Sequence, residues 1–363
     1  MLRLALCVGL LLFVFQGIFF QEARRLTRTQ GIQWEQLSVK TRLQIAWTAG
    51  PKALWHTILQ LHPTEGILSV ACVGIAIFLG ARRWQKLLHT QGLYLPWSRV
   101  VEISLVAQFF NSFLLGTAGG DLMKAYYTAR ETHHLKTESV TTVVVDRLLG
   151  LTTMLLTATI MILPNLAVLT AHKRWPFLLA ILLGMTGGAL GISYLSFFGG
   201  VSQLFPALRP WLSQNTLGRT FLRSIDAARV YGKSLPTLLQ AILFSFGVTL
   251  ACTAQIALLA RGLDAPVSFA ALLWIVPTVI CISALPITPS GLGVRENLYV
   301  WLLSAPPLAM PATKALSLSL LALAGSVFWS SIGGLVYVGF RRQHRLKELL
   351  QEAEEPPEEV EVA

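Results

Sequence analysis

Long apolar stretches, separated by short polar or charged segments, follow one another along this chain. They lie near residues 2–20, 66–81, 139–163, 177–198, 236–260 and 313–340. A helix needs roughly 20 apolar residues to cross a hydrocarbon layer about 30 Å thick. A helix also satisfies its own backbone hydrogen bonds, which the interior of a membrane requires. The pattern therefore predicts an all-α polytopic membrane protein with about six full spans.

Two further apolar segments, residues 99–130 and 268–305, are broken by glycine, proline and polar residues. The first contains FFNSFLLGTAGGDLMKAYYTAR and the second contains ALPITPSGLGVRENLYVWLL. Lysine and arginine gather on both sides of the first segment, at residues 82–99 and 124–136. Such clusters favour the cytoplasmic side of a membrane. A segment with both ends on one side cannot cross, so we expect a re-entrant helical hairpin.

The second broken segment is flanked by Arg261 and Lys314, which the same topology places outside. It is expected to form a second re-entrant hairpin that enters from the opposite face. The order span, span, hairpin, span then occurs twice, in halves at about residues 1–163 and 177–340. We interpret this as an inverted repeat within one transmembrane domain, residues 1–340, with both termini cytoplasmic.

The two breaks can be aligned with each other. Residues 117–124 lie over residues 288–295, and both read T-x-[GS]-G-x-x-x-[KR]. Corresponding interruptions in two halves are the best sequence indication of a transporter's binding site.

Composition agrees with the membrane class. Apolar residues make up 54% of the chain and charged residues 13%, where soluble domains are about a quarter charged. The net charge of +11 is typical of cytoplasmic loops in membrane proteins, so no nucleic-acid partner is expected. Residues 2–20 lack a cleavage signal and predict a retained anchor. Residues 21–63, placed outside, depart from the charge rule with six Lys or Arg, and residues 41–61 are interpreted as an interfacial helix.

Each break predicts a place where backbone amides bind an anion. Non-helical backbone survives inside a membrane only when it is buried in protein or lines a wet cavity. A half-helix that starts after Gly119 and Gly120 directs free N–H groups and its positive dipole end into the cavity, with Lys124 in its first turn. The alternative is an ordinary helix start, with Asp121 as N-cap and Lys124 extended to the surface. The second break offers the corresponding set Gly291, Gly293 and Arg295.

Other polar residues in apolar surroundings can be interpreted as structural or as functional. Asp146 and Arg147 either neutralise each other or leave Arg147 for an anionic ligand. Glu296 either pairs with the adjacent Arg295 or carries a proton for ion coupling. Asn111 is expected to satisfy carbonyls freed at the first break. The paired histidines of the following loop lack the i, i+4 spacing of a helical metal site, so no metal is expected.

The segments RRWQKLL, FFNSFLLGTAGGDLMKAYY, VVVDRLLGL and LPITPSGLGVRE occur in this order along the chain. As an ordered set they resemble the motifs of the lysylphosphatidylglycerol synthase transmembrane-region family, also described as flippase-like, over residues 2–340. The resemblance implies a polytopic inner-membrane protein similar to the lipid-translocating half of the bacterial lysyl-lipid synthases. It implies as functional candidates Gly119, Gly120, Asp121, Lys124, Asp146, Arg147, Thr288, Gly291, Gly293, Arg295 and Glu296.

The sequence departs from the family pattern at several positions. Family members often have Pro where Leu115 stands and Arg where Lys124 stands, and a lysine cannot hold a phosphate bidentately. No soluble aminoacyl-transfer domain accompanies the membrane region. Residues 341–363 are basic and then acidic, and we expect a disordered cytoplasmic tail there. The chain is therefore expected not to synthesise lysyl-lipid and not to be an enzyme.

The leading hypothesis is a lipid translocator in the cytoplasmic (inner) membrane, acting on a phospholipid or another anionic lipid. An isolated ion that enters a low-dielectric medium costs tens of kcal/mol, so a phosphate-bearing headgroup needs a neutralising route. No GxxxxGK[ST] motif for ATP is present, and no cofactor is expected. The alternatives are a non-catalytic membrane partner of a lipid or glycan synthase, and an intramembrane lipid-modifying enzyme.

Overall fold

The computed structural model describes residues 2–29, 34, 37–113, 119–132, 136–165, 175–198, 228–285, 288–306 and 308–354. Every regular element in these ranges is helical. The long helices are α1 (Leu2–Thr29), α2 (Val39–Leu59), α3 (Pro63–Thr90), α4 (Trp97–Phe113), α5 (Gly119–Glu131), α6 (Lys136–Ile162), α8 (Trp175–Phe198), α12 (Leu235–Gly262), α13 (Phe269–Ser283), α14 (Val294–Ser304) and α15 (Ala312–Glu354), with the single turns η3 (Leu163–Asn165) and η4 (Pro289–Gly291).

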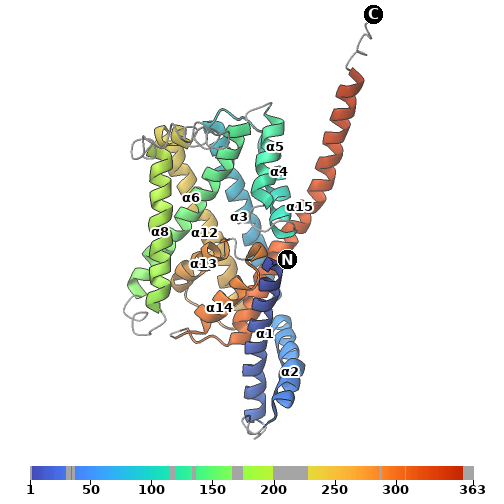
Figure 1. Cartoon of the computed structure of the whole chain (residues 1–363), viewed down its shortest axis with the longest axis vertical. Coiled ribbons are helices and arrows are strands. Elements are labelled where there is room, and N and C mark those ends of the chain that lie inside the picture. Colours follow the sequence, from blue (N-terminus) through green and yellow to red (C-terminus); the bar gives the residue numbers. More distant parts are fainter. Residues whose placement is uncertain are drawn as a thin grey trace, which may run out of the picture.

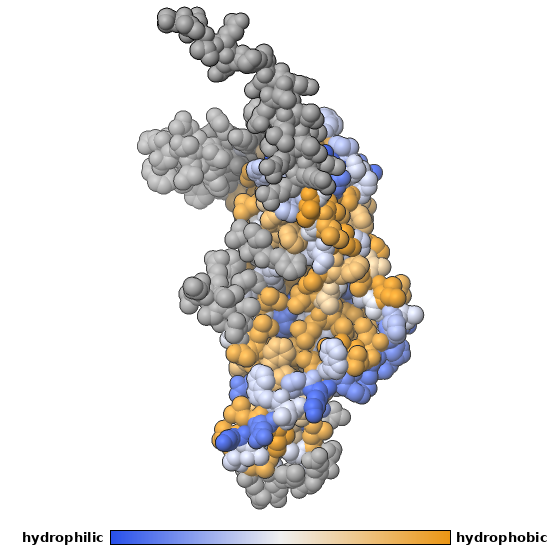
Figure 2. Space-filling model, turned by 90° about the vertical axis from the view of Figure 1, so that its right-hand side faces the viewer, coloured by the Kyte–Doolittle hydropathy of each residue, from blue (hydrophilic) through white to orange (hydrophobic). Residues whose placement is uncertain are grey.

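Five described helices are long and apolar enough to cross a membrane, namely α3, α6, α8, α12 and α15. They correspond to five of the six predicted spans. The remaining one, residues 2–20, lies on α1, which is not among these five, and it stays a prediction. Figure 2 shows apolar residues over most of the described surface on one side of the molecule, with hydrophilic residues gathered toward its lower end. The chain is thus a multi-pass helical membrane protein.

Helices α3 and α12 form the centre of the bundle and run antiparallel (Figure 1). At one end the N–H of His62, just before α3, donates to the carbonyl of Gly262, the last residue of α12, at 3.1 Å. At the other end the hydroxyl of Tyr231, just before α12, donates to the carbonyl of Leu87 near the end of α3, at 3.1 Å. These contacts fix which helix ends lie together.

The two broken segments each form a hairpin of two helices. In the first hairpin, α4 and α5 pack against each other, and Arg99 at the start of α4 pairs with Glu131 at the end of α5 at 3.4 Å. In the second hairpin, α13 packs against α14. Its open end is fixed by Lys314, after α14, whose ammonium donates to the carbonyl of Leu263, before α13, at 2.7 Å. The first hairpin opens where α3 ends, and the second opens where α3 begins.

Helices α1 and α2 pack on each other beside the end of the bundle that holds α14 (Figure 1). Residues 41–61, predicted to form an interfacial helix, largely coincide with α2 (Val39–Leu59); the position of this helix at a membrane interface stays a prediction. Its buried residues Ala46 and Leu54 meet Ile18 and Phe19 of α1 and Leu316 of α15 in one apolar cluster. Helix α1 begins level with the middle of the bundle and continues below it.

The last helix is longer than predicted. We expected disorder from residue 341, yet α15 continues to Glu354 and projects beyond the bundle (Figure 1). The sequence LKELLQEAE explains the difference, because all of these residue types are good helix formers. The acidic end of the chain, residues 355–363, lies outside the described residues.

Close helix packing joins the two parts of the bundle. Helix α15 packs on α4, and helix α13 packs on α6. Where α15 crosses α4, a Cβ on Gly333 would overlap the backbone carbonyl of Leu105. Glycine at this position therefore lets the two backbones approach each other, as small residues do between membrane helices.

Replacing Gly333 by alanine should therefore destabilise the bundle by about 1–3 kcal/mol, because the new methyl group forces α15 away from α4. Thermal unfolding in detergent, followed by tryptophan fluorescence, measures the loss. Gly339→Ala on the same helix is the control, since no atom lies within 4 Å of its added Cβ. Equal unfolding temperatures for the two variants would contradict the packing described here.

Candidate functional site

A cavity of about 410 Å³ lies at the centre of the bundle, where both hairpins end. Every described helix from α3 onward contributes to its wall except α8. Most of the wall is apolar, with several polar side chains. Those used below are Arg83, Asn111, Asp121, Lys124, Asp146 and Arg295.

The inner ends of the two hairpins touch. Asn111, near the end of α4, accepts the N–H of Gly120 on its side-chain oxygen at 2.9 Å. Its backbone carbonyl accepts the hydroxyl of Ser290, from the turn between α13 and α14, at 2.8 Å. The expected structural role of Asn111 is thus seen, with one correction. Its side chain serves a freed amide rather than a freed carbonyl.

The second break requires unusual backbone conformations, which explains its sequence PSGLG. Ser290, Gly291 and Gly293 have φ values of 54°, 68° and 83°. Such positive values suit glycine, which has no Cβ to clash. At Gly291 a Cβ would also lie 2.8 Å from the carbonyl oxygen of Ser283, so the turn closes tightly against the end of α13.

Glu296 caps the helix that follows this break. One carboxylate oxygen accepts the N–H of Gly293 at 2.6 Å, and the other pairs with the guanidinium of Arg295 at 2.9 Å. The side chain of Glu296 is fully buried. This is the structural pairing that the sequence suggested as one of two readings.

Three of the glycine amides that were expected to be free at the breaks donate hydrogen bonds within the protein. The N–H groups of Gly120 and Gly293 donate to Asn111 and Glu296, and that of Gly291 donates to the carbonyl of Thr288 at 3.3 Å. The prediction of amides offered to an anion is therefore wrong at these three glycines. The cationic side chains that line the cavity, Lys124 and Arg295 among them, are the remaining candidates for holding an anion.

Lys124 occupies the second turn of α5, because that helix begins at Gly119; we had predicted the first turn. Its ammonium lies 3.5 Å from a carboxylate oxygen of Asp146 and 4.8 Å from the ring centre of Trp84. The side chain is 15% exposed and lines the cavity. It does not extend to the bundle surface, which removes the alternative reading of this residue.

Arg83 is the residue that the sequence reasoning missed. We had counted it in a cytoplasmic basic cluster, but its side chain is buried in the bundle. The guanidinium donates to Asp146 at 2.7 Å and to the hydroxyl of Ser245 at 2.9 Å. Gly150 on α6 makes room for it, since a Cβ there would lie 2.8 Å from a guanidinium nitrogen. The only available signal was its place in the RRWQKLL motif.

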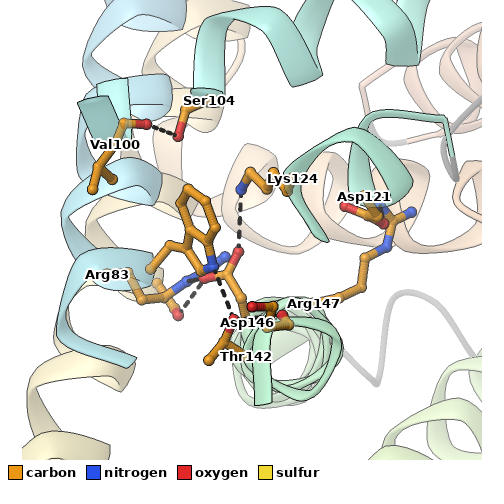
Figure 3. Close-up of polar contacts among 11 residues, drawn as sticks. Arg83, Val100, Ser104, Asp121, Lys124, Thr142, Asp146 and Arg147 are labelled. Carbon is orange, nitrogen blue, oxygen red and sulfur yellow. Dashed lines mark hydrogen bonds and ion pairs between the residues drawn. The ribbon is translucent and has the colours of Figure 1, made fainter. Parts of the chain in front are cut away.

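Asp146 and Arg147 do not neutralise each other. Neighbours on a helix point in different directions, and here Asp146 faces Arg83 and Lys124 while Arg147 faces Asp121 at 2.8 Å (Figure 3). In the empty site Asp121 holds Arg147, and a role of Arg147 toward an anionic ligand stays a prediction. Asp121 is likewise an ion-pair partner rather than a simple N-cap.

The predicted site residues therefore fall into two groups. Those that line the cavity are Asn111, Asp121, Lys124, Asp146 and Arg295. Those that shape the breaks or pair with lining residues are Gly119, Gly120, Arg147, Thr288, Gly291, Gly293 and Glu296. Residues 117 and 118, Leu115, and the paired histidines His133 and His134 lie outside the described residues. In the ranges that the structure describes, no group of His, Cys, Asp and Glu has the arrangement of a metal site.

Residues 36–336 match the family model for the lysylphosphatidylglycerol synthase TM region. The chain belongs to this family. The match covers both hairpins and the whole cavity, and it confirms the resemblance of the four motifs. No curated protein sequence matches the chain. Family membership agrees with the multi-pass helical structure. It assigns no substrate to the cavity.

The capping role of Glu296 leads to a prediction about stability. Glu296→Ala should lower the free energy of unfolding by about 3 kcal/mol or more, because it leaves Arg295 and the buried Gly293 amide without their partner. Glu296→Gln should lose clearly less, since its side-chain carbonyl still accepts the Gly293 N–H. Thermal unfolding of the two purified variants measures the difference. Equal losses would show that the hydrogen bond to Gly293 does not stabilise the break.

Proposed function

We propose that this chain translocates a phosphate-bearing lipid headgroup across the cytoplasmic membrane through the central cavity. One observation carries the proposal: Lys124 and Arg295, one from each hairpin, line the same cavity. The two hairpins open toward opposite ends of the bundle, so each cation belongs to an element that faces a different leaflet. The N- and C-termini are proposed to be cytoplasmic, as the basic clusters indicate.

The pattern of helix contacts supports an inverted repeat. Helix α4 packs on α15 as α13 packs on α6, and α5 packs on α6 as α14 packs on α15. Exchange of the two halves leaves this pattern unchanged, with α3 and α12 paired at the centre. We interpret both hairpins as re-entrant, and rocking of one half against the other would expose the cavity to each leaflet in turn.

The cations suit a phosphate. A Lys or Arg within a membrane protein is costly and is usually retained for a ligand or an ion path. Lys124 has one long ion-pair contact, 3.5 Å to Asp146, and its ammonium lies over the ring of Trp84. Arg295 gives its Nε and one Nη to Glu296, while a guanidinium has five N–H donors in all. Both side chains therefore retain hydrogen-bonding capacity toward the cavity.

Translocation of the lipid makes and breaks no covalent bond. A lipid moves between leaflets, and the bilayer and the lipid are the partners it requires. The buried position of Glu296, clamped between Arg295 and Gly293, favours a structural role over proton coupling for this residue.

Lys124→Gln and Arg295→Gln should each slow lipid transfer by at least about tenfold, the effect of losing one charge-assisted hydrogen bond. The measurement is transfer of a fluorescent phosphatidylglycerol between the leaflets of reconstituted vesicles, read by quenching with an impermeant reductant.

Arg261→Gln is the matched control, because this exposed residue lies at the end of α12 and does not line the cavity. Lys124→Arg and Arg295→Lys keep the charge and should retain most of the activity. Transfer at the wild-type rate by both Gln variants, incorporated to the same level, would refute the proposed function.

A further inference from the structure

The charged side chains around the cavity nearly cancel one another, and their net charge is positive. The charged side chains of the described wall are Arg83, Asp121, Lys124, Asp146 and Arg295. Two of them have a further partner, Arg147 for Asp121 and Glu296 for Arg295. The described site thus holds four cations and three carboxylates, which leaves one positive charge.

Each carboxylate has a close cation, so we count all three as ionised. Asp146 lies 2.7 Å from Arg83, Asp121 lies 2.8 Å from Arg147, and Glu296 lies 2.9 Å from Arg295. These are the lengths of charge-assisted hydrogen bonds. Lys124 differs, because its contact to Asp146 is 3.5 Å and that carboxylate is already paired with Arg83. The positive excess is therefore concentrated at Lys124 (Figure 3).

We infer that the cavity selects headgroups that carry a single negative charge on phosphate, a phosphodiester, over phosphomonoesters, and that Asp146 sets this preference by occupying Lys124 in the empty site. The inference rests on the proposed lipid site. A diester phosphate completes the charge balance of the cavity. A monoester adds a second negative charge beside Asp146 and leaves the cavity with a negative excess, which an apolar wall disfavours.

The same counting predicts how substitutions change the preference. Asp146→Asn raises the excess to two positive charges and should favour the monoester. Arg83→Gln lowers the positive excess to zero. It should weaken the binding of both lipids, and that of the monoester more. The double variant Arg83→Gln/Asp146→Asn restores one positive charge and should restore the preference of the wild type, although both side chains have changed.

The test uses the whole chain in neutral detergent at about pH 8, where a phosphomonoester carries close to two charges because its second pKa is about 6. A fluorescent phosphatidylglycerol is displaced by unlabelled phosphatidylglycerol or by phosphatidic acid with the same acyl chains. The wild type should prefer phosphatidylglycerol. Asp146→Asn should shift the ratio of the two affinities toward phosphatidic acid by at least about tenfold, because one charge at roughly 10 Å and an effective dielectric of roughly 20 already gives that much and a phosphate beside Asp146 lies closer.

Asp264→Asn is the matched control, because this exposed aspartate lies outside the cavity, and it should leave the ratio unchanged. An unchanged ratio in Asp146→Asn, or a double variant that behaves like Asp146→Asn alone, would overturn the inference. If Asp146→Asn does not fold, Arg83→Gln tests the inference instead. It should shift the affinity ratio in the opposite direction, toward phosphatidylglycerol, and an unchanged ratio would overturn the inference. The vesicle assay remains independent: lost selectivity with normal transfer refutes only this inference, and the expected selectivity without transfer refutes only the proposed function.

Discussion

Backbone groups that leave a helix inside an apolar bundle need partners, and this requirement governs the centre of the molecule. In each hairpin a side chain of the same hairpin accepts a backbone amide at the start of the second helix. Asn111 accepts the Gly120 amide, and Glu296 accepts the Gly293 amide. The hydroxyl of Ser290 then joins the turn of the second hairpin to the backbone of Asn111, near the end of α4. The hairpins are thereby fixed to each other at their inner ends, and the cavity lies beside that junction.

The amides of Gly120, Gly291 and Gly293 are used within the protein, and charged side chains line the cavity. A buried cation with no partner is costly, and each of the four cations has a carboxylate nearby. Three of these contacts are short, whereas the contact of Lys124 is longer and goes to a carboxylate that it shares with Arg83. An anionic headgroup would compete with Asp146 for this lysine, and Arg83 would keep Asp146 compensated when it does. On this proposal, the ion pairs of the empty bundle would also set the conditions for binding.

The sequence predicted the larger features well for physical reasons. Apolar length located the five helices that the structure describes as possible spans, and Gly and Pro located the two breaks. It also identified Lys124 and Arg295, because a cation within an apolar segment stands out. It could not identify Arg83, because an arginine at the end of an apolar run looks the same whether it turns into the bundle or into solvent. Nor could it pair Asp121 with Arg147, since these residues lie on different helices and only the packing of α5 against α6 brings them together.

The central claim is that the two hairpin ends meet and present Lys124 and Arg295 to one phosphate. An experimental structure of the chain in nanodiscs that contain phosphatidylglycerol tests it most directly. The account predicts a lipid whose phosphate lies within the cavity, in contact with the ammonium of Lys124 and the guanidinium of Arg295, with Asn111 and Ser290 still hydrogen-bonded. A cavity that holds no headgroup while lipids bind only at the ends of the bundle, or hairpin ends that lie apart, would contradict it.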